Sequence, residues 1–208
     1  MKAKEDVSSE MISRSQEREQ KVRYNELSVI RKDKADMRSF KNLFLHGLYF
    51  ALYSLVKNLS FPFSNYLRYL VIRIFTSSIH TTYISEGVTI FFPWNVQIGK
   101  KSSLNAGVII DGYGHVSIGK GVRIAAYTCI NTADHAFDDL DTLIMDQGYI
   151  TGEVIIEDNV WIGAGTKINK GISVGEGSVI GSGSVITRCI PSFSVAAGVP
   201  CRIIRPRK

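Results

Sequence analysis

Branched aliphatic residues recur at every sixth position through much of the chain. These positions are Ile84, Ile90, Ile98, Leu104, Ile110, Ile118, Ile124, Ile130, Ile156, Ile162, Ile168, Val174, Ile180 and Ile186. The longest unbroken run starts at Ile156, whereas steps of eight replace steps of six after Ile90 and after Ile110. Neither the period of two of a strand nor the period of 3.6 of a helix explains this spacing.

Six residues suffice for one short strand and a sharp turn. Three such units close a triangular coil of about 18 residues, and coils stack into a parallel solenoid with the aliphatic side chains inside. Seventeen of the 18 glycines lie between Gly87 and Gly198, where tight corners favour them. The steps of eight are insertions at a corner, and the longer gap predicts a loop near residues 131–153. We therefore expect an all-β fold, a parallel β-helix over residues 81–208.

The segment before the repeat has helical periodicity instead. Between residues 40 and 59 apolar side chains recur at helical spacing, and Pro62 ends the pattern. Ser64 or Asn65 can cap a second helix that continues to about Ile74. Residues 40–80 are thus predicted to form an amphipathic helical hairpin, an α-helical appendage to the β-helix.

Two interpretations of this hairpin remain open. Its apolar side chains and flanking lysines and arginines suit peripheral membrane contact through residues 40–75. Alternatively, the hairpin packs on the open end of the solenoid or on a neighbouring subunit. Residues 1–39 are polar and charged without sustained periodicity, and we interpret them as a disordered extension or a loosely held helix.

The distribution of charge along the chain restricts the classes of function that the protein can have. The formal net charge is +6, but residues 131–158 carry eight acids and no Lys or Arg, whereas residues 188–208 carry five bases and no acid. This arrangement indicates two small sites and argues against nucleic acid as a partner. Three cysteines without a CxxC pair and an N-terminus without an apolar signal core favour the cytoplasm.

Three stretches carry a resemblance to a known family. They are INTADHAFDD (130–139), VWIGAGTKINKGISVGEGSVIGSGSVITRCIP (160–191) and AAGVPCRIIR (196–205). Here the chain resembles the hexapeptide-repeat acyltransferases, in particular the branch of sugar and polysaccharide O-acetyltransferases. The resemblance implies a left-handed β-helix, acetyl-CoA as co-substrate, no metal, and a homotrimer with sites between subunits. It also implies a sugar or a bacterial surface polysaccharide unit as acceptor.

The resemblance assigns residues to acyl transfer. His135 matches the family's general base, and an imidazole with a pKa near neutrality suits proton removal from a hydroxyl. Asn105 matches an asparagine of the acceptor site, although a turn asparagine is the alternative. Asp134 and Asp138 are candidates for orienting His135 or binding sugar hydroxyls, or else they are solvated loop acids.

A second group of matches implies a coenzyme A site, whose phosphates the basic C-terminus suits. Its members are Trp161, Ala164, Ser182, Thr187, Arg188 and Arg205. Arg188 stands where the family has a lysine, which keeps the charge but changes the geometry.

Other functions stay open at this stage. The enzyme alternative is an N-acetyltransferase of a nucleotide-linked amino sugar, and the non-enzyme alternative is a catalytically silent solenoid scaffold. Cys129 is a candidate acyl-enzyme nucleophile, although a small semi-buried thiol is the simpler interpretation. We expect a cytoplasmic protein, with the inner face of the plasma membrane as the alternative location if the hairpin binds lipid.

Overall fold

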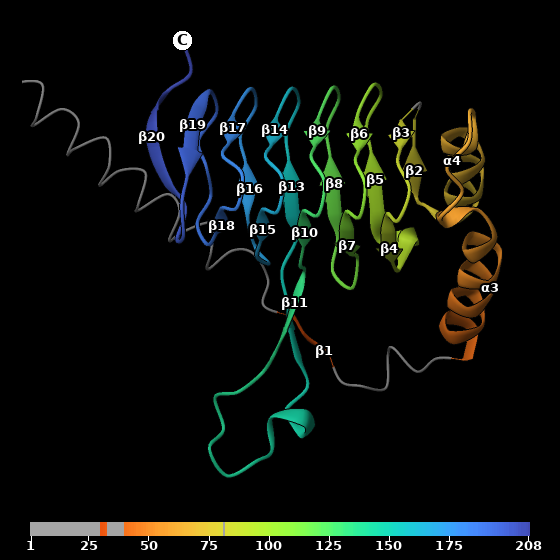
Figure 1. Ribbon diagram of the computed structural model, residues 1–208. Helices are drawn as coiled ribbons and strands as arrows, with labels where there is room; N and C mark the ends of the chain where they lie inside the picture. Colours follow the sequence, from red (N-terminus) through yellow and green to blue (C-terminus); the bar gives the residue numbers. More distant parts are fainter. Residues whose placement is uncertain (1–29, 33–39, 81) are drawn as a thin grey trace, which may run out of the picture.

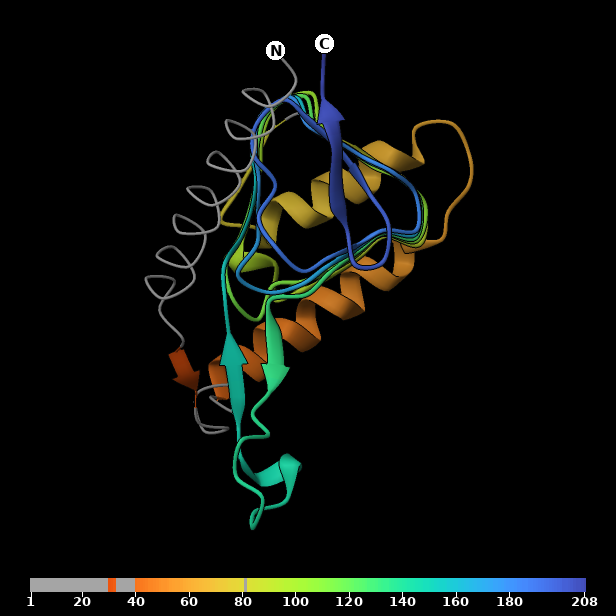
Figure 2. The same ribbon diagram turned by 90° about the vertical axis from the view of Figure 1, so that its left-hand side faces the viewer.

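The structure is a computed structural model that describes residues 30–32, 40–80 and 82–208. Over the described residues the chain forms a left-handed parallel β-helix of about six turns with two helices at its N-terminal end (Figure 1). Viewed along the solenoid axis, the coils superimpose as a triangle (Figure 2). The fold class predicted from the six-residue period is confirmed.

Three parallel sheets make the faces of the triangle. The first face holds β2 (Ser78–Ile79), β5 (Val96–Ile98), β8 (Val116–Ile118), β13 (Val154–Ile156) and β16 (Ser173–Val174). The second face holds β3 (Tyr83–Ile84), β6 (Ser103–Leu104), β9 (Arg123–Ile124), β14 (Trp161–Ile162), β17 (Val179–Ile180), β19 (Ser194–Ala197) and the antiparallel β20 (Arg202–Pro206). The third face holds β4 (Thr89–Phe91), β7 (Ile109–Asp111), β10 (Cys129–Ile130), β15 (Lys167–Ile168) and β18 (Val185–Ile186).

The aliphatic residues of the repeat fill the interior. All fourteen are at most 3% exposed, and each pairs with its equivalent in the adjacent coil, as Ile130 does with Ile110 and Ile168. Close stacking of coils leaves no room for a side chain at some corners. A Cβ added to Gly163 would lie 2.5 Å from the backbone nitrogen of Ser182 in the next coil. The period of six is therefore the period of inward burial.

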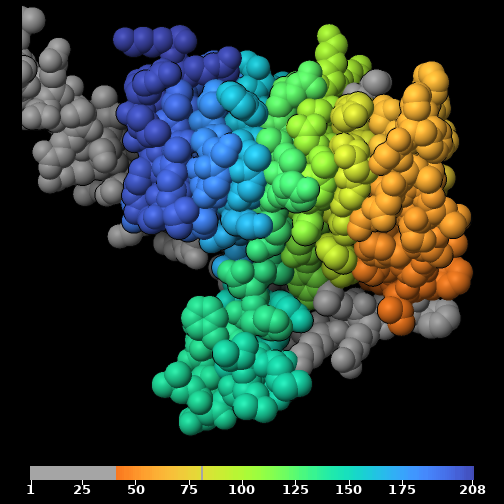
Figure 3. Space-filling view, viewed as in Figure 1, coloured from red at the N-terminus to blue at the C-terminus, as the bar shows by residue number. Residues whose placement is uncertain are grey.

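The insertions all lie at one corner, which joins the third face of one coil to the first face of the next. We call it the third corner. It holds the short 3-10 helix η1 (Pro93–Asn95), residues 112–115 and, in the third coil, the excursion between Ile130 and Val154. The excursion is an antiparallel hairpin of β11 (Ala133–His135) and β12 (Tyr149–Thr151) with η2 (Ile144–Asp146) near its tip. It projects from the body of the molecule (Figure 3).

Two helices cover the first coil. In α3 (Phe40–Lys57) Tyr49 and Tyr53 are fully buried, and the Tyr53 hydroxyl donates a hydrogen bond to the carbonyl of Val88 at 3.0 Å. In α4 (Ser64–Phe75) the buried Arg68 donates from Nε to the carbonyl of Ile84 at 2.9 Å and from Nη1 to that of Leu59 at 2.6 Å. The helices thereby shield the open end of the solenoid from water.

The start of α4 corrects one expectation. The N-cap is Phe63 in a left-handed conformation, with no side-chain capping bond, so neither Ser64 nor Asn65 caps the helix. Ser64 is buried inside the first turn, where its Oγ accepts a hydrogen bond from Arg68 Nη2 at 3.2 Å. The hydroxyl is therefore used to hold the buried guanidinium.

Two boundaries also differ from expectation. The β-helix begins at β2, inside the range expected to be helical hairpin, because Ile79 pairs with Ile98 in the first face. Ile30–Lys32 forms β1, which pairs antiparallel with β12 and extends the β11–β12 hairpin to three strands. The expectation of disorder or a loose helix is wrong there, and the rest of residues 1–39 lies outside the described residues.

Candidate active site

The third corner carries an open pocket of about 560 Å³. Its lining residues belong to the end of β7 and to the connections that follow β4, β7 and β10. The lining residues are Phe92, Asp111, Tyr113, Ala133, Asp134, His135, Phe137, Ile144 and Tyr149. The pocket is therefore made from the places where the six-residue repeat is interrupted.

His135 ends β11 and faces this pocket. It is cross-strand neighbour to Tyr149 of β12, and the two ring centroids lie 4.5 Å apart. The aromatic contacts continue from Tyr149 to Tyr113 at 5.3 Å and from Tyr113 to Phe92 at 5.6 Å. An exposed imidazole beside an aromatic wall can meet a small acceptor that packs on the wall.

A carboxyl group lies at the same wall. Asp111 lines the pocket, and its Oδ1 accepts a hydrogen bond from the backbone N–H of Tyr113 at 3.1 Å. Thr132 Oγ1 donates to the Asp111 carbonyl at 2.7 Å and accepts from the N–H of Gly114 at 2.7 Å. Burial raises the pKa of Asp111 above its usual value. The bonds made by Thr132 therefore link residues 111–114, which lead from β7 to β8, to the base of the β11–β12 hairpin.

The two acidic candidates of the loop have different environments. Asp134 lines the pocket, and its Oδ2 lies 2.6 Å from Nζ of Lys170 in the fourth coil. This ion pair ties the hairpin to the solenoid. Asp138 is exposed and is not among the residues that line the pocket.

The predicted acceptor residue Asn105 and several of the predicted coenzyme residues lie elsewhere on the chain. Asn105, Ala164 and Ser182 follow strands of the second face, at the corner between the second and third faces. All three are exposed, and Trp161 on β14 is 55% exposed nearby. None of these four lines the His135 pocket. Within one chain, the structure therefore separates the proposed base from most of the proposed coenzyme groove.

The basic candidates are also at the surface. Thr187 and Arg188 follow β18, so they lie at the third corner, the corner of the His135 pocket but in a later coil. Arg205 is on the exposed β20, where it pairs with Val195. The structure thus brings His135 together with Asp134 alone of the other predicted site residues.

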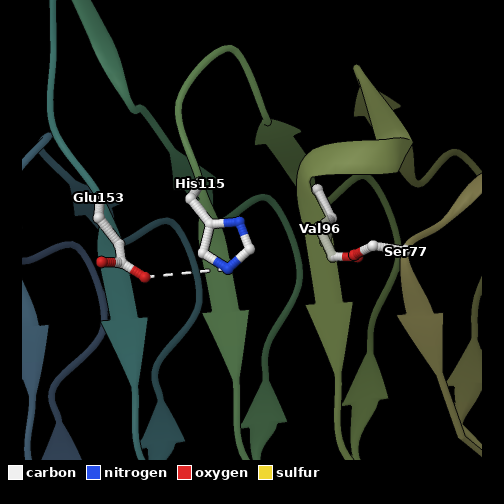
Figure 4. Close-up of polar contacts among 4 residues, drawn as sticks. All are labelled: Ser77, Val96, His115 and Glu153. Atoms are coloured by element: carbon white, nitrogen blue, oxygen red, sulfur yellow. Dashed lines mark hydrogen bonds and ion pairs between the residues drawn. The ribbon is translucent and has the colours of Figure 1, made fainter. Parts of the chain in front are cut away.

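Sequence reasoning missed Phe92, Asp111, Tyr113 and Tyr149 as pocket residues. The available signal was the pair of eight-residue steps, because each places its extra residues at the corner from which the long loop also leaves. His115 and Glu153 lie at the same corner, directly before β8 and β13, but do not line the pocket. Nε2 of His115 lies 3.9 Å from Oε1 of Glu153 (Figure 4), and both side chains are substantially exposed.

Cys129 does not have the environment of a nucleophile. It is partly buried on the third face, and burial raises the pKa of its thiol, which disfavours the reactive thiolate. Its Sγ lies 3.3 Å from Oδ1 of Asn131. Among the described residues, no three His, Cys, Asp or Glu side chains are grouped so that they could hold a metal ion.

Comparison with known proteins agrees with this architecture. Residues 153–188 match the family model described as bacterial transferase hexapeptide (six repeats). The chain is 35% identical over 134 residues to a putative acetyltransferase of Dictyostelium discoideum, a match that covers 64% of this chain and 69% of that one. The chain belongs to the hexapeptide-repeat acyltransferase family.

Other relatives of this hexapeptide-repeat protein have more specific names. The galactoside O-acetyltransferase of Escherichia coli K12 is 34% identical over 137 residues, which cover 65% of this chain and 66% of the relative. Across the first three curated relatives, the matched region spans 38%, 66% and 56% of the relative's length.

Solved structures share this fold, and one of them contains coenzyme A. A maltose O-acetyltransferase from Clostridium difficile 630 superimposes with a TM-score of 0.76 at 28% identity, covering 83% of this chain and 91% of that chain. A galactoside acetyltransferase in complex with coenzyme A superimposes with a TM-score of 0.68 at 26% identity, covering 82% and 84%.

Proposed function

We propose that the protein transfers an acetyl group from acetyl-CoA to a hydroxyl of a sugar or of a surface polysaccharide unit. The observation that carries the proposal is the placement of His135 in an open pocket with aromatic walls, on a fold whose relatives include sugar acetyltransferases. Asp111 and Asp134 supply carboxylate oxygens at the same wall, which can accept hydrogen bonds from sugar hydroxyls.

The proposed reaction is a direct transfer. A ring nitrogen of His135 takes the proton of the acceptor hydroxyl while its oxygen attacks the thioester carbonyl. The tetrahedral intermediate collapses, the carbon–sulfur bond breaks, and the coenzyme A thiolate takes the proton back from the imidazolium. Donors aimed at the developing oxyanion lower the barrier.

Coenzyme A is proposed to lie along the corner that carries Ala164 and Ser182. Ala164 and Ser182 lie in adjacent coils that are joined directly here, because the N–H of Gly183 bonds to the carbonyl of Ala164 at 2.7 Å. Their small side chains leave the surface of this corner open to an extended chain. Trp161 beside this corner has the exposed ring that a ligand or a neighbouring subunit would cover. Arg188 and Arg205 are the bases proposed to meet the coenzyme phosphates.

The separation of these two corners supports the proposal of a homotrimer with sites between subunits. His135 projects from the third corner, whereas Asn105, Ala164 and Ser182 occupy another corner of the triangle. A neighbouring subunit that presents its coenzyme corner to this subunit's hairpin would complete the site. Equilibrium sedimentation should give three times the 23.1 kDa chain mass, and a monomeric mass would contradict this arrangement.

A thiol-release assay tests the activity. We expect wild-type protein to release coenzyme A from acetyl-CoA when a galactoside, a glucoside or a polysaccharide repeat unit is added. His135→Gln should lower the rate by about 10² to 10⁴, and Asp141→Asn, at an exposed loop residue outside the pocket, serves as the matched loop control. Turnover with amino sugars alone would support N-acetylation, and no turnover with any acceptor would support a scaffold.

A further inference from the structure

The helices that close the solenoid are apolar on both sides. The inner side of α3 is occupied, because Tyr49 and Tyr53 are fully buried against the first coil. The outer side carries Leu48, Leu52 and Leu55, which are 41%, 40% and 71% exposed. A surface helix of a globular domain normally has polar side chains on its outer face. Sealing the β-helix therefore does not account for the outer leucines.

The same is true of α4 and of the turn that connects the two helices. Phe63 in the turn is 81% exposed and Ile74 in α4 is 72% exposed, whereas the residues that α4 buries are Ser64, Arg68 and Ile72. Part of the apolar surface of α4 thus points outward. We call these outer side chains of α3, the turn and α4 the cap surface. It lies at the end of the solenoid remote from the C-terminus (Figure 1).

The charged side chains of α3, the turn and α4 themselves have one sign. Residues 37–85 include no Asp or Glu, while Lys41 and Arg73 are exposed and Lys57 is half-buried at the end of α3. Apolar side chains bordered by lysine and arginine match the interface of a bilayer with anionic headgroups. A second copy fits less well, because a face-to-face pair would bring these like charges together.

Among the described residues, neither α3 nor α4 has the length and hydropathy of a membrane-spanning helix. We propose that the cap surface binds an anionic lipid bilayer, with α3 and α4 lying in the headgroup layer and their outer side chains inserted toward the acyl chains. Binding leaves the buried faces of both helices on the solenoid, so no unfolding of the cap is required.

The cap surface is also joined to the pocket. His46 of α3 stacks on Phe92, a pocket-lining residue, with ring centroids 4.8 Å apart and planes inclined by 8°. One helix diameter, about 10 Å, separates the outer face of α3 from this contact. Together with the proposed function, on which this step rests, bilayer binding would hold the pocket close to acceptors carried by lipids.

Vesicle flotation of the full chain tests the proposal without reference to activity. Phosphatidylcholine vesicles are compared with vesicles of phosphatidylcholine and phosphatidylglycerol at roughly 7:3. We expect co-flotation with the anionic vesicles, released by high salt, and at least about tenfold weaker binding to phosphatidylcholine alone. Absence of binding, or equal binding to both compositions, would overturn the proposal.

Two variants separate the contributions. Leu55→Glu with Ile74→Glu should weaken binding by about tenfold or more, because it removes two exposed aliphatic side chains and adds repulsion. The matched control, Leu140→Glu with Ile204→Glu, makes the same chemical change at residues 96% and 64% exposed away from the cap, and should bind as wild type. Equal loss in both double variants would show that the effect is one of net charge.

Lys41→Gln with Arg73→Gln keeps the apolar side chains and needs no change in packing. It should weaken binding to the anionic vesicles by about tenfold and leave binding to phosphatidylcholine unchanged. Light scattering in lipid-free buffer tests whether a second copy of the chain covers the cap surface instead of lipid. If the wild-type mass is halved by Leu55→Glu with Ile74→Glu, the cap surface is a contact between copies, and the bilayer proposal is wrong.

Discussion

Tyr149 and His135 face each other across the β11–β12 hairpin, with ring centroids 4.5 Å apart and planes inclined by 35°. The imidazole therefore rests on an aromatic ring whose own strand is paired on both edges, with β11 and with β1. Because Tyr149 also contacts Tyr113, the ring that packs against the proposed base is supported by residues 112–115 as well as by its own hairpin.

Tyr149 is thus expected to act as a positioning residue. Tyr149→Ala should lower kcat by about a hundredfold through misplacement of His135, while Tyr149→Phe keeps the ring and should restore most of the activity. Steady-state kinetics with acetyl-CoA and a responsive acceptor measure both. An equal loss in the Phe and Ala variants would assign the effect to the hydroxyl instead.

The ion pair between Asp134 and Lys170 permits a test of what Asp134 does. Their side chains are 46% and 20% exposed, so the pair should contribute no more than about 1 kcal/mol to stability. If Asp134 binds the acceptor, Asp134→Ala raises the acceptor KM and Lys170→Met does not. A similar KM increase in both variants would show that the carboxylate acts by holding the hairpin.

Much of the fold was predictable because burial in a β-helix is local in sequence. Within the uninterrupted run, three six-residue steps place Ile162 directly beside Ile180 in the next coil, so the inward positions there follow from the period. The pocket was harder to predict, since Phe92 and Asp111 meet His135 only when three separate insertions share a corner. The separation of Asn105 from His135 likewise depends on which corner each residue occupies, which a linear motif does not state.

Two glycine substitutions should have opposite effects on stability. Gly163→Ala should lower the free energy of unfolding by about 1–3 kcal/mol, because its Cβ would lie 2.5 Å from Ser182 N and 2.7 Å from Ile180 O, both backbone atoms. Gly47→Ala in α3 has nothing within 4 Å and should raise stability by about 0.5–1 kcal/mol. Urea denaturation of the two variants measures the difference, and a Gly163→Ala protein as stable as wild type would contradict the observed coil spacing.

His46 should make the cap sensitive to acid. Burial among aromatic rings lowers the pKa of His46 from its usual value near 6.5, and its Nε2 has no hydrogen-bond partner among the described residues. The unfolded chain therefore binds this proton more tightly than the folded chain does. The stability that neutral His46 provides is therefore complete above pH 6.5. The free energy of unfolding falls progressively as the pH drops below that value and His46 is protonated.

Two substitutions isolate this effect from the titration of other groups. Both His46→Phe and His46→Gln remove the titrating ring, so urea denaturation between pH 8 and pH 5 should show a flatter acid dependence for each. His46→Phe should also be the more stable of the two at pH 8, because it keeps the stacking on Phe92 and buries no polar atom. An acid dependence as steep as that of wild type in both variants would place the sensitive group elsewhere. The contact between His46 of α3 and Phe92 of the pocket wall would then be stabilised by ring packing alone.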